Sequence, residues 1–376
     1  MISPIRFLQR LSCLLLIFTS PFLLCAESIE LPNFPVLDDT TRPYDVIGVG
    51  GCIMDIVIKV SQKTYKNLSG TLGGAQVVDE ATLSNMIKSV GNEPQLVPGG
   101  SCANTIKGLA KTGKKIAFFS KRGDDEIGTL LEKSLSTHKV DPLLSISKQP
   151  TGHLASFVNP QGERTFFVCP GATLDLTSKD FTNEVFKKCK IVHIEGYFLR
   201  NNDAIETCMK LAKEAGCIVS FDLGCFELVR EHKEKVQNLL EKYVDILIAN
   251  KFEAKELTGK SPKDACKQIQ KIVKVAIVLT GKRGCWVGSQ GKLVSSTGLA
   301  ANVVDTTGAG DLYTSGFLYA LLERKPLEEC AYIGNLFGKS VIENIGAEIP
   351  EDKWAPIIQE LDRLNKKDNM ILTKAS

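Results

Sequence analysis

The chain has 376 residues, 43% of them hydrophobic, which is enough to bury the core of one large α/β domain with a small appendage. Its 46 basic and 43 acidic residues leave a formal net charge of +3, so composition gives no electrostatic case for a nucleic-acid partner. Twelve cysteines are present without metal-site or redox spacing, which favours free buried thiols in a reducing compartment.

Residues 1–26 have the order of a secretory signal. Arg6 and Arg10 precede a short apolar stretch, and Ala26 offers a small residue at a cleavage point. The apolar stretch is shorter than the roughly 20 residues of a membrane-spanning helix, so we expect no stable membrane span in the mature protein. Export, organelle import and an extension ahead of the true start are the alternatives for this segment.

Beyond a polar linker over 27–43, strand-like apolar runs alternate with helical stretches as far as residue 360, and a polar tail covers 361–376. Such alternation predicts a mostly parallel sheet with helices on both faces. The predicted central strands are 46–49, 116–119, 191–194, 218–221, 246–249 and 275–279. The predicted helices include 202–215, 231–243 and 263–271.

Two further stretches depart from this alternating plan. Residues 55–60, and residues 153–158 followed across a turn by 163–168, predict antiparallel strands of a second, smaller sheet. The aromatic residues of these strands could line a ligand-facing side or pack within the sheet.

Glycine-rich segments at 98–104 and 303–311 each lead into a helical pattern, over 106–111 and 312–322 respectively. In both segments, small residues allow a ligand to approach the unpaired backbone N–H groups at a helix start. Those donors and the helix dipole together favour phosphate or a developing negative charge.

The second of these segments adds a carboxylate. Asp311 comes in the first helical turn, directly after Gly308, Ala309 and Gly310. It could accept a proton from an attacking hydroxyl while the backbone amides neutralise a transferring phosphoryl group. The alternative is a glycine-rich turn in which the aspartate caps the helix.

Together with the strand at 44–51, these segments resemble the ribokinase-like, or PfkB-type, family of carbohydrate and nucleoside kinases. Its two signatures, Gly-Gly…Asn and Asp-Thr-x-Gly-Ala-Gly-Asp, stand here in the expected order, and the resemblance covers roughly 44–354. Within the family the chain is most similar to the adenosine kinase branch. The resemblance implies an α/β fold: a three-layer α/β/α sandwich with a mostly parallel central sheet. It also implies a β-stranded lid near 55–75 and 152–170, through which two copies could pair.

The resemblance implies roles for single residues. Asp311 matches the catalytic base, and residues 308–310 match the anion hole that holds the transferring phosphoryl group. The positions that match sugar-hydroxyl contacts are Asp55, Gly99, Gly100 and Asn104. For Asp55 the alternative is a turn residue at the end of a strand.

A nucleotide and a metal are implied as well. Asn250 and Glu253 match an Asn-x-x-Glu element that organises magnesium, water and phosphate, so Glu253 would act on the metal through water. A helix cap is the alternative for Asn250. The other positions that match nucleotide contacts are Thr280, Gly281, Gly284, Asn335, Gly346 and Ala347.

The implied function is transfer of the ATP γ-phosphoryl group to a primary hydroxyl of a sugar or nucleoside, with ATP and Mg²⁺ as cofactors. ATP chemistry and the free thiols favour the cytoplasm, whereas residues 1–26 favour export or organelle targeting. The alternative from another class is an exported, non-catalytic sugar- or nucleoside-binding protein on the same scaffold, which the intact Asp311 opposes.

Overall fold

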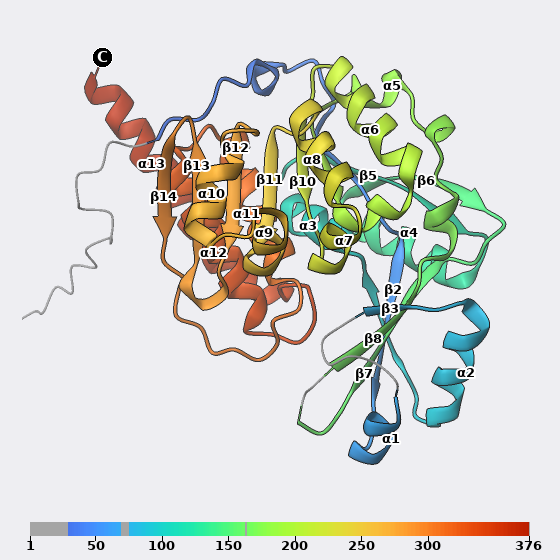
Figure 1. The fold of residues 1–376 in the computed structure, drawn as a ribbon. Coiled ribbons are helices and arrows are strands. Elements are labelled where there is room, and N and C mark those ends of the chain that lie inside the picture. The colour runs from blue at the N-terminus through green and yellow to red at the C-terminus, as the bar shows by residue number, and fades with distance from the viewer. Residues whose placement is uncertain (1–28, 69–74, 162–163, 376) are drawn as a thin grey trace, which may run out of the picture.

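The computed structural model describes residues 29–68, 75–161 and 164–375, and within these ranges the strands form two sheets. The larger sheet has the strand order β14-β13-β12-β11-β10-β9-β1-β5-β6, and the smaller has the order β3-β8-β7-β2-β4 (Figure 1). The larger sheet contains β1 (Tyr44–Val49), β5 (Ile116–Gly123), β6 (Val140–Ser147), β9 (Cys189–Glu195), β10 (Ile218–Asp222), β11 (Ile246–Asn250), β12 (Val275–Leu279), β13 (Cys285–Ser289) and β14 (Lys292–Ser296). The smaller sheet contains β2 (Ile53–Lys59), β3 (Ala75–Val77), β4 (Gln95–Gly99), β7 (Gly152–Val158) and β8 (Arg164–Cys169).

Helices fill most of the remaining described chain. They are α1 (Gln62–Asn67), α2 (Glu80–Val90), α3 (Ser101–Ala110), α4 (Glu126–Thr137), α5 (Asn183–Phe186), α6 (Asn202–Glu214), α7 (Phe226–Glu231), α8 (Lys233–Lys242), α9 (Lys251–Thr258), α10 (Pro262–Ile269), α11 (Ala309–Leu322), α12 (Leu327–Ile342) and α13 (Trp354–Ala375).

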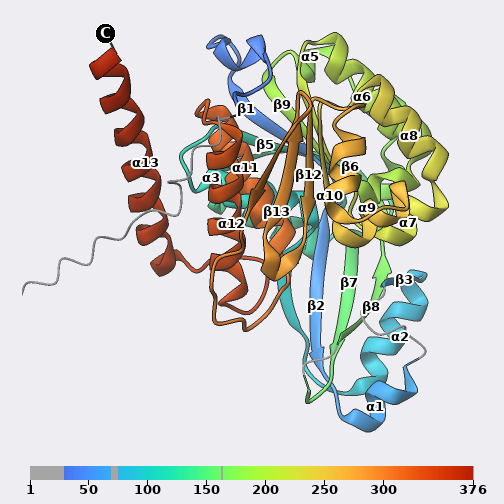
Figure 2. The ribbon, with the colours of Figure 1, turned by 60° about the vertical axis from the view of Figure 1, so that its left-hand side comes forward.

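The central sheet is mostly parallel and is covered on both faces. All six predicted central strands are present and pair in parallel, as expected for apolar runs that bury both sides. Successive side chains enter opposite cores: Val46 belongs to the core that includes residues of α3, α11 and α12, whereas Ile47 belongs to the core that includes residues of α6, α8 and α10. Figure 2 shows these two helical layers on either side of the sheet. The predicted three-layer α/β/α architecture is therefore confirmed.

The smaller sheet projects from one edge of the larger domain and contains the strands predicted to form a lid, and we refer to it as the lid (Figure 1). One face of it is packed beneath α2 and α4, where Phe157 and Phe167 are fully buried, so these two aromatics pack the sheet. The expectation of antiparallel strands was wrong for the pair β2–β7, which is parallel. Strand β3, which was not predicted, also pairs in parallel with β8, whereas the β7–β8 and β2–β4 pairs are antiparallel. Pairing of two copies through the edge strands stays a prediction.

Residues close to both ends of the described chain contribute to the core of the domain. In the stretch expected to be a linker, Ile29, Phe34 and Leu37 are buried in the core. The expected polar tail continues helix α13, in which Leu361 and Leu364 are also buried. Residues 1–26, interpreted as a signal, lie outside the described residues. In the part of the chain that is described, no helix combines the length and the apolar character needed to cross a bilayer.

Helices α3 and α11 pack directly against each other, and this contact positions the site. A Cβ added at Gly108 would lie only 2.5 Å from Leu312 Cδ1, so glycine lets the two helices approach closely. Ser315 Oγ on α11 also donates to the Thr105 carbonyl at 2.6 Å. The two glycine-rich helix starts are thereby held side by side.

Candidate active site

Helix α11 begins at a left-handed glycine. Gly308 is its N-cap with φ of +74°, and an added Cβ would lie 2.6 Å from the Cβ of Ala347. Asp305 fixes the turn, because its carboxylate accepts from the Thr307 backbone N–H at 3.0 Å and the Gly346 N–H at 2.9 Å. Gly346 and Ala347, both predicted nucleotide positions, therefore lie against the predicted anion hole.

Asp311 joins the two glycine-rich segments. It follows Ala309 and Gly310 in the first turn of α11, and its carboxylate accepts from Ser101 Oγ at 2.8 Å and Asn104 Nδ2 at 3.0 Å. Burial raises the pKa of Asp311, and the two hydrogen bonds oppose that rise because they stabilise the ionised carboxylate. Ser101 and Asp311 are 210 residues apart in the chain, so only the fold brings them together.

The first glycine pair forms the adjoining wall. Gly100 is the N-cap of α3 with φ of +96°, and a Cβ there would lie 2.6 Å from the Gly51 carbonyl oxygen. A Cβ on Gly99 would lie 2.5 Å from the carboxyl carbon of Asp55, so the Asp55 side chain lies against this turn. All four predicted acceptor positions, from Asp55 to Asn104, are thus brought into one region beside Asp311.

Glu195 connects two segments of the same region by hydrogen bonds. This buried last residue of β9 accepts from the Gly51 N–H at 2.7 Å and from the Cys102 N–H at 2.8 Å. Burial raises the pKa of Glu195 to about 7, although both N–H groups favour its ionised form. Glu195 therefore fixes the turn after β1 against the start of α3.

Asn250 and Glu253 form a reciprocal cap at the start of α9. Asn250 Oδ1 accepts from the Glu253 N–H at 3.1 Å, and Glu253 Oε2 accepts from the Asn250 N–H at 2.7 Å. The helix-cap alternative for Asn250 is therefore correct as a description of its local geometry, and it holds the Glu253 carboxylate in one orientation.

The carboxylates of Glu253 and Asp222 are close enough at this edge of the sheet for the charge of Asp222 to act on Glu253. Burial raises the pKa of Glu253, and the neighbouring Asp222 at the end of β10 raises it further. Burial likewise raises the pKa of Asp222. Buried acids with raised pKa values fit a nearby cation, which would favour their ionised forms. Across the described ranges, no three His, Cys, Asp or Glu side chains gather to hold a metal ion by themselves.

The remaining nucleotide positions lie in two places. Thr280 and Gly284 close a tight turn after β12, in which Thr280 Oγ1 donates to the Gly284 carbonyl at 2.8 Å, and Gly281 lies between them with φ of +64°. Leu279, just before that turn, lies close to Gly310. A cavity of about 370 Å³ adjoins the turn and is lined in part by Thr280, Arg283, Trp286 and Thr297.

Asn335 is already engaged within the protein. Its Nδ2 donates to Ser296 Oγ at 2.9 Å and to the Thr297 carbonyl at 3.2 Å, so the amide anchors α12 to the end of β14. The structure thus places Gly346 and Ala347 against the predicted anion hole. Asn335 instead holds Ser296 and Thr297, which line the cavity, by hydrogen bonds.

Sequence reasoning assigned no role to Ser101, Glu195 and Asp222. Glu195 and Asp222 are the last residues of parallel strands, and Ser101 begins the helix that follows the first glycine pair. Ligands of open α/β sheets bind at the carboxyl ends of strands, so polar residues in those positions were the available signal.

The fold and the site together define a class of protein. Next to the mostly parallel sheet lies a helix start with its backbone amides. The first turn of that helix holds a carboxylate, which accepts from a hydroxyl and an amide group. These groups suit an enzyme that transfers a phosphoryl group to a small molecule. A family model described as pfkB family carbohydrate kinase matches residues 76–354, so the chain belongs to that family and is a phosphotransferase with an alcohol acceptor.

Known proteins similar to this chain include both sugar and nucleoside kinases. A fructokinase of Vibrio alginolyticus is 32% identical over 238 residues, which are 60% of this chain and 76% of that protein. The solved structure of an adenosine kinase from Sinorhizobium meliloti is 28% identical with a TM-score of 0.78, covering 86% of this chain and 99% of that one. A probable sugar kinase from Rhizobium etli is 26% identical with a TM-score of 0.79, at the same coverage.

Proposed function

We propose that the protein is an ATP-dependent kinase that phosphorylates the primary hydroxyl of a nucleoside, with Asp311 as general base. The carrying observation is the placement of the Asp311 carboxylate in the first turn of α11, hydrogen-bonded to Ser101 and Asn104. These two residues belong to residues 99–104, which we call the acceptor wall. The residues whose amides would hold the phosphoryl group, 308–310, come directly before Asp311 in the chain.

The transfer uses positioning and charge stabilisation. An acceptor hydroxyl bound against Gly99, Gly100 and Asn104 loses its proton to Asp311 as its oxygen attacks the γ-phosphorus. The backbone N–H groups of residues 308–310 stabilise the negative charge on the transferring phosphoryl group. ADP leaves, and the proton on Asp311 passes to solvent, so the reaction needs no covalent enzyme intermediate.

Magnesium fits the carboxylates beyond the phosphate end of the site. Asp222 and Glu253 would hold it through water, with Asn250 keeping Glu253 in place. Bound there, the ion would neutralise charge on the nucleotide phosphates.

The lid favours a nucleoside over a simple sugar. Residues paired across β4, β2, β7, β8 and β3 place one row of side chains on the face of the sheet opposite its packed core. That row is Val97, Asp55, Leu154, Val168 and Val77. Its four apolar members are only partly buried, and Val77 is 50% exposed. A flat base could cover this apolar surface while Asp55 accepts from ribose hydroxyls, whereas a hexose has no apolar part of that size.

A screen of acceptors tests the proposal. The full chain is incubated with MgATP and adenosine, guanosine, ribose or fructose, and both ADP release and the phosphorylated product are measured. We expect adenosine or guanosine to give the highest kcat/KM. Turnover of fructose or ribose alone would refute the nucleoside assignment. Binding of these compounds without any turnover would favour the non-catalytic binding protein.

A further inference from the structure

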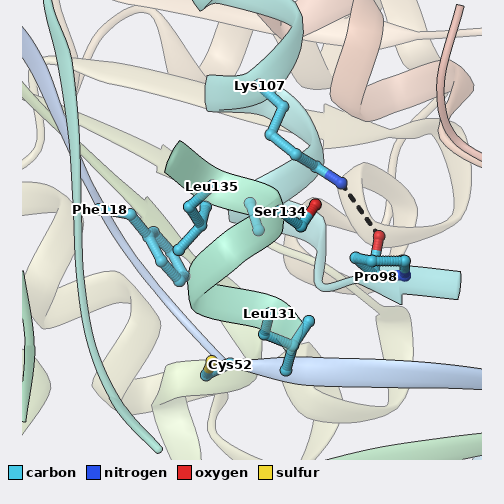
Figure 3. A pocket seen from close by; sticks show the side chains of 9 residues that line it. Cys52, Pro98, Lys107, Phe118, Leu131, Ser134 and Leu135 are labelled. Atoms are coloured by element: carbon cyan, nitrogen blue, oxygen red, sulfur yellow. Dashed lines mark hydrogen bonds between the residues drawn. The ribbon is translucent and has the colours of Figure 1, made fainter. Parts of the chain in front are cut away.

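Lys107 is a buried cation close to the site. It lies on α3, one turn after Asn104, and is only 3% exposed. Its Nζ donates to the Pro98 carbonyl at 3.0 Å and forms an ion pair with Glu348. Figure 3 shows the side chain leaving its helix with the amino group directed at Pro98. A charge buried to this extent is costly unless it is paired, so the Lys107 contacts are expected to hold their geometry.

The two partners of Lys107 belong to opposite sides of the site. Pro98 lies in lid strand β4, directly before the Gly99-Gly100 turn that faces the acceptor. Glu348 directly follows Ala347, and Ala347 packs against Gly308. A Cβ added to Gly308 would lie only 2.6 Å from the Cβ of Ala347. One amino group thus connects the acceptor wall, through Pro98, to the segment that rests on the anion hole.

We propose that Lys107 is a positioning residue that seats residues 346–348 against Gly308 by its ion pair with Glu348, and links that seat to the acceptor wall through Pro98. This rests on the proposed kinase function of the same site. Without the pair, residues 346–348 would still be held by the Gly346 N–H bond to Asp305 and by the contact of Glu348 with His138, but less firmly against Gly308. More of the phosphate-binding turn would then have to be ordered when the nucleotide binds.

The chain supplies a matched control at Lys111, the residue that directly follows the last residue of α3. Lys111 forms an ion pair with Glu351, so it joins α3 to the same part of the chain that contains Glu348. Its partner is 81% exposed, and Lys111 has no contact with Pro98 among its hydrogen bonds to the described residues. Any general role in attaching this segment to α3 should therefore appear equally at Lys111.

Binding of a non-hydrolysable ATP analogue, measured by calorimetry, tests the proposal without requiring turnover. We expect Lys107→Met to weaken binding of the analogue by roughly 3- to 30-fold, the range found for residues that couple sites through contacts. Affinity for the acceptor in the absence of nucleotide should change less than about twofold. Glu348→Gln removes the same ion pair and also the charged partner that lies 3.5 Å from His138 Nε2, so its loss of affinity should be at least as large. The double variant should be no weaker than the weaker single variant, because both changes remove the Lys107–Glu348 pair.

Lys111→Met should bind the analogue within about twofold of wild type. Equal losses in Lys107→Met and Lys111→Met, or no loss in Lys107→Met, would overturn the proposal. If Lys107→Met does not fold, Glu348→Gln decides, because that side chain is 41% exposed and tolerates substitution more readily. Failure of the kinase proposal gives a different result, namely wild-type protein that binds the analogue but phosphorylates none of the acceptors.

Discussion

Asp311 is the residue on which the proposed chemistry depends most directly. Asp311→Asn keeps the size of the side chain and one oxygen acceptor for Ser101 or Asn104, but it removes the basic carboxylate. We expect kcat to fall by roughly 10²- to 10⁴-fold, the contribution usual for general-base catalysis. Steady-state kinetics measures this, and thermal unfolding of the variant serves as the folding control. Near-normal turnover in a folded variant would remove Asp311 from its role.

Ser101 should tune the proton affinity of that base. Because Asp311 must be ionised to accept a proton, activity should be lost as pH falls through its pKa, which burial raises above the ordinary aspartate value. Ser101→Ala removes a hydrogen bond to the ionised form, so the pKa should rise further. The acid limb of the kcat/KM profile should then move upward by roughly 1 pH unit.

The control for this shift is Ser136→Ala, which removes a hydroxyl that donates to the Glu132 carbonyl on the exposed side of α4. Its pH profile should coincide with that of wild type. An acid limb in Ser101→Ala that stays in place would show that the Ser101 hydroxyl does not stabilise the ionised base.

At the same scale, motif residues could be predicted and their supporting partners could not. Asp311 and Asn104 lie within short signatures, so local sequence was sufficient to place them in the site. Glu195 acts on Gly51, 144 residues away, and Lys107 acts on Glu348, 241 residues away. These contacts depend on which strands and helices become neighbours, which local sequence does not specify.

Among the secondary-structure elements, the strands that bury both faces were the predictable ones. Continuous apolar runs identified β1, β5 and β9 to β12, because a parallel strand that is covered by helices on both faces is apolar at nearly every position. The edge strands β6 and β14 carry polar residues on their exposed sides and were missed. The parallel pairing of β2 with β7 was also missed, because it joins residues about 100 positions apart.

The glycine turn that starts α11 gives a prediction at this level. Gly308→Ala places a side chain at φ of +74° and its Cβ 2.6 Å from that of Ala347, so the turn and residues 346–348 must separate. We expect a loss of stability of about 1 to 2 kcal/mol from the backbone conformation. We also expect kcat to fall by roughly 10²- to 10³-fold, as when one donor to a developing anion is lost.

Gly91→Ala is the matched control for Gly308→Ala. Gly91 ends α2 at φ of +68°, and nothing lies within 4 Å of the position that its Cβ would occupy. It should therefore lose a similar amount of stability in denaturant titrations while keeping wild-type turnover. If both variants retain full activity, the Gly308 turn does not hold the phosphoryl group.

In the whole molecule, buried acids at the carboxyl edge of the sheet make stability depend on pH. Burial raises the pKa of Glu195 to about 7, and it also raises the pKa of Asp222 and of Glu253. A carboxyl group with a raised pKa in the folded state contributes stability at low pH, and that contribution is lost as pH rises through the folded value. His193 has the opposite sign, because burial lowers its pKa to about 4, but its contribution changes mainly below the ordinary value of 6.5.

Between about pH 6.5 and 8, the free energy of unfolding should therefore fall, by about 1 kcal/mol for Glu195 alone. Denaturant titrations at the two pH values measure this fall, and Glu195→Gln should reduce it. Glu348→Gln is the control: burial opposes ionisation, but His138 and Lys107 lower the pKa of Glu348 to about 2, so this group stays ionised throughout the window. A pH dependence in Glu195→Gln equal to that of wild type would mean that Glu195 is already ionised at pH 6.5 in the folded protein. The N–H groups of Gly51 and Cys102 would then outweigh its burial.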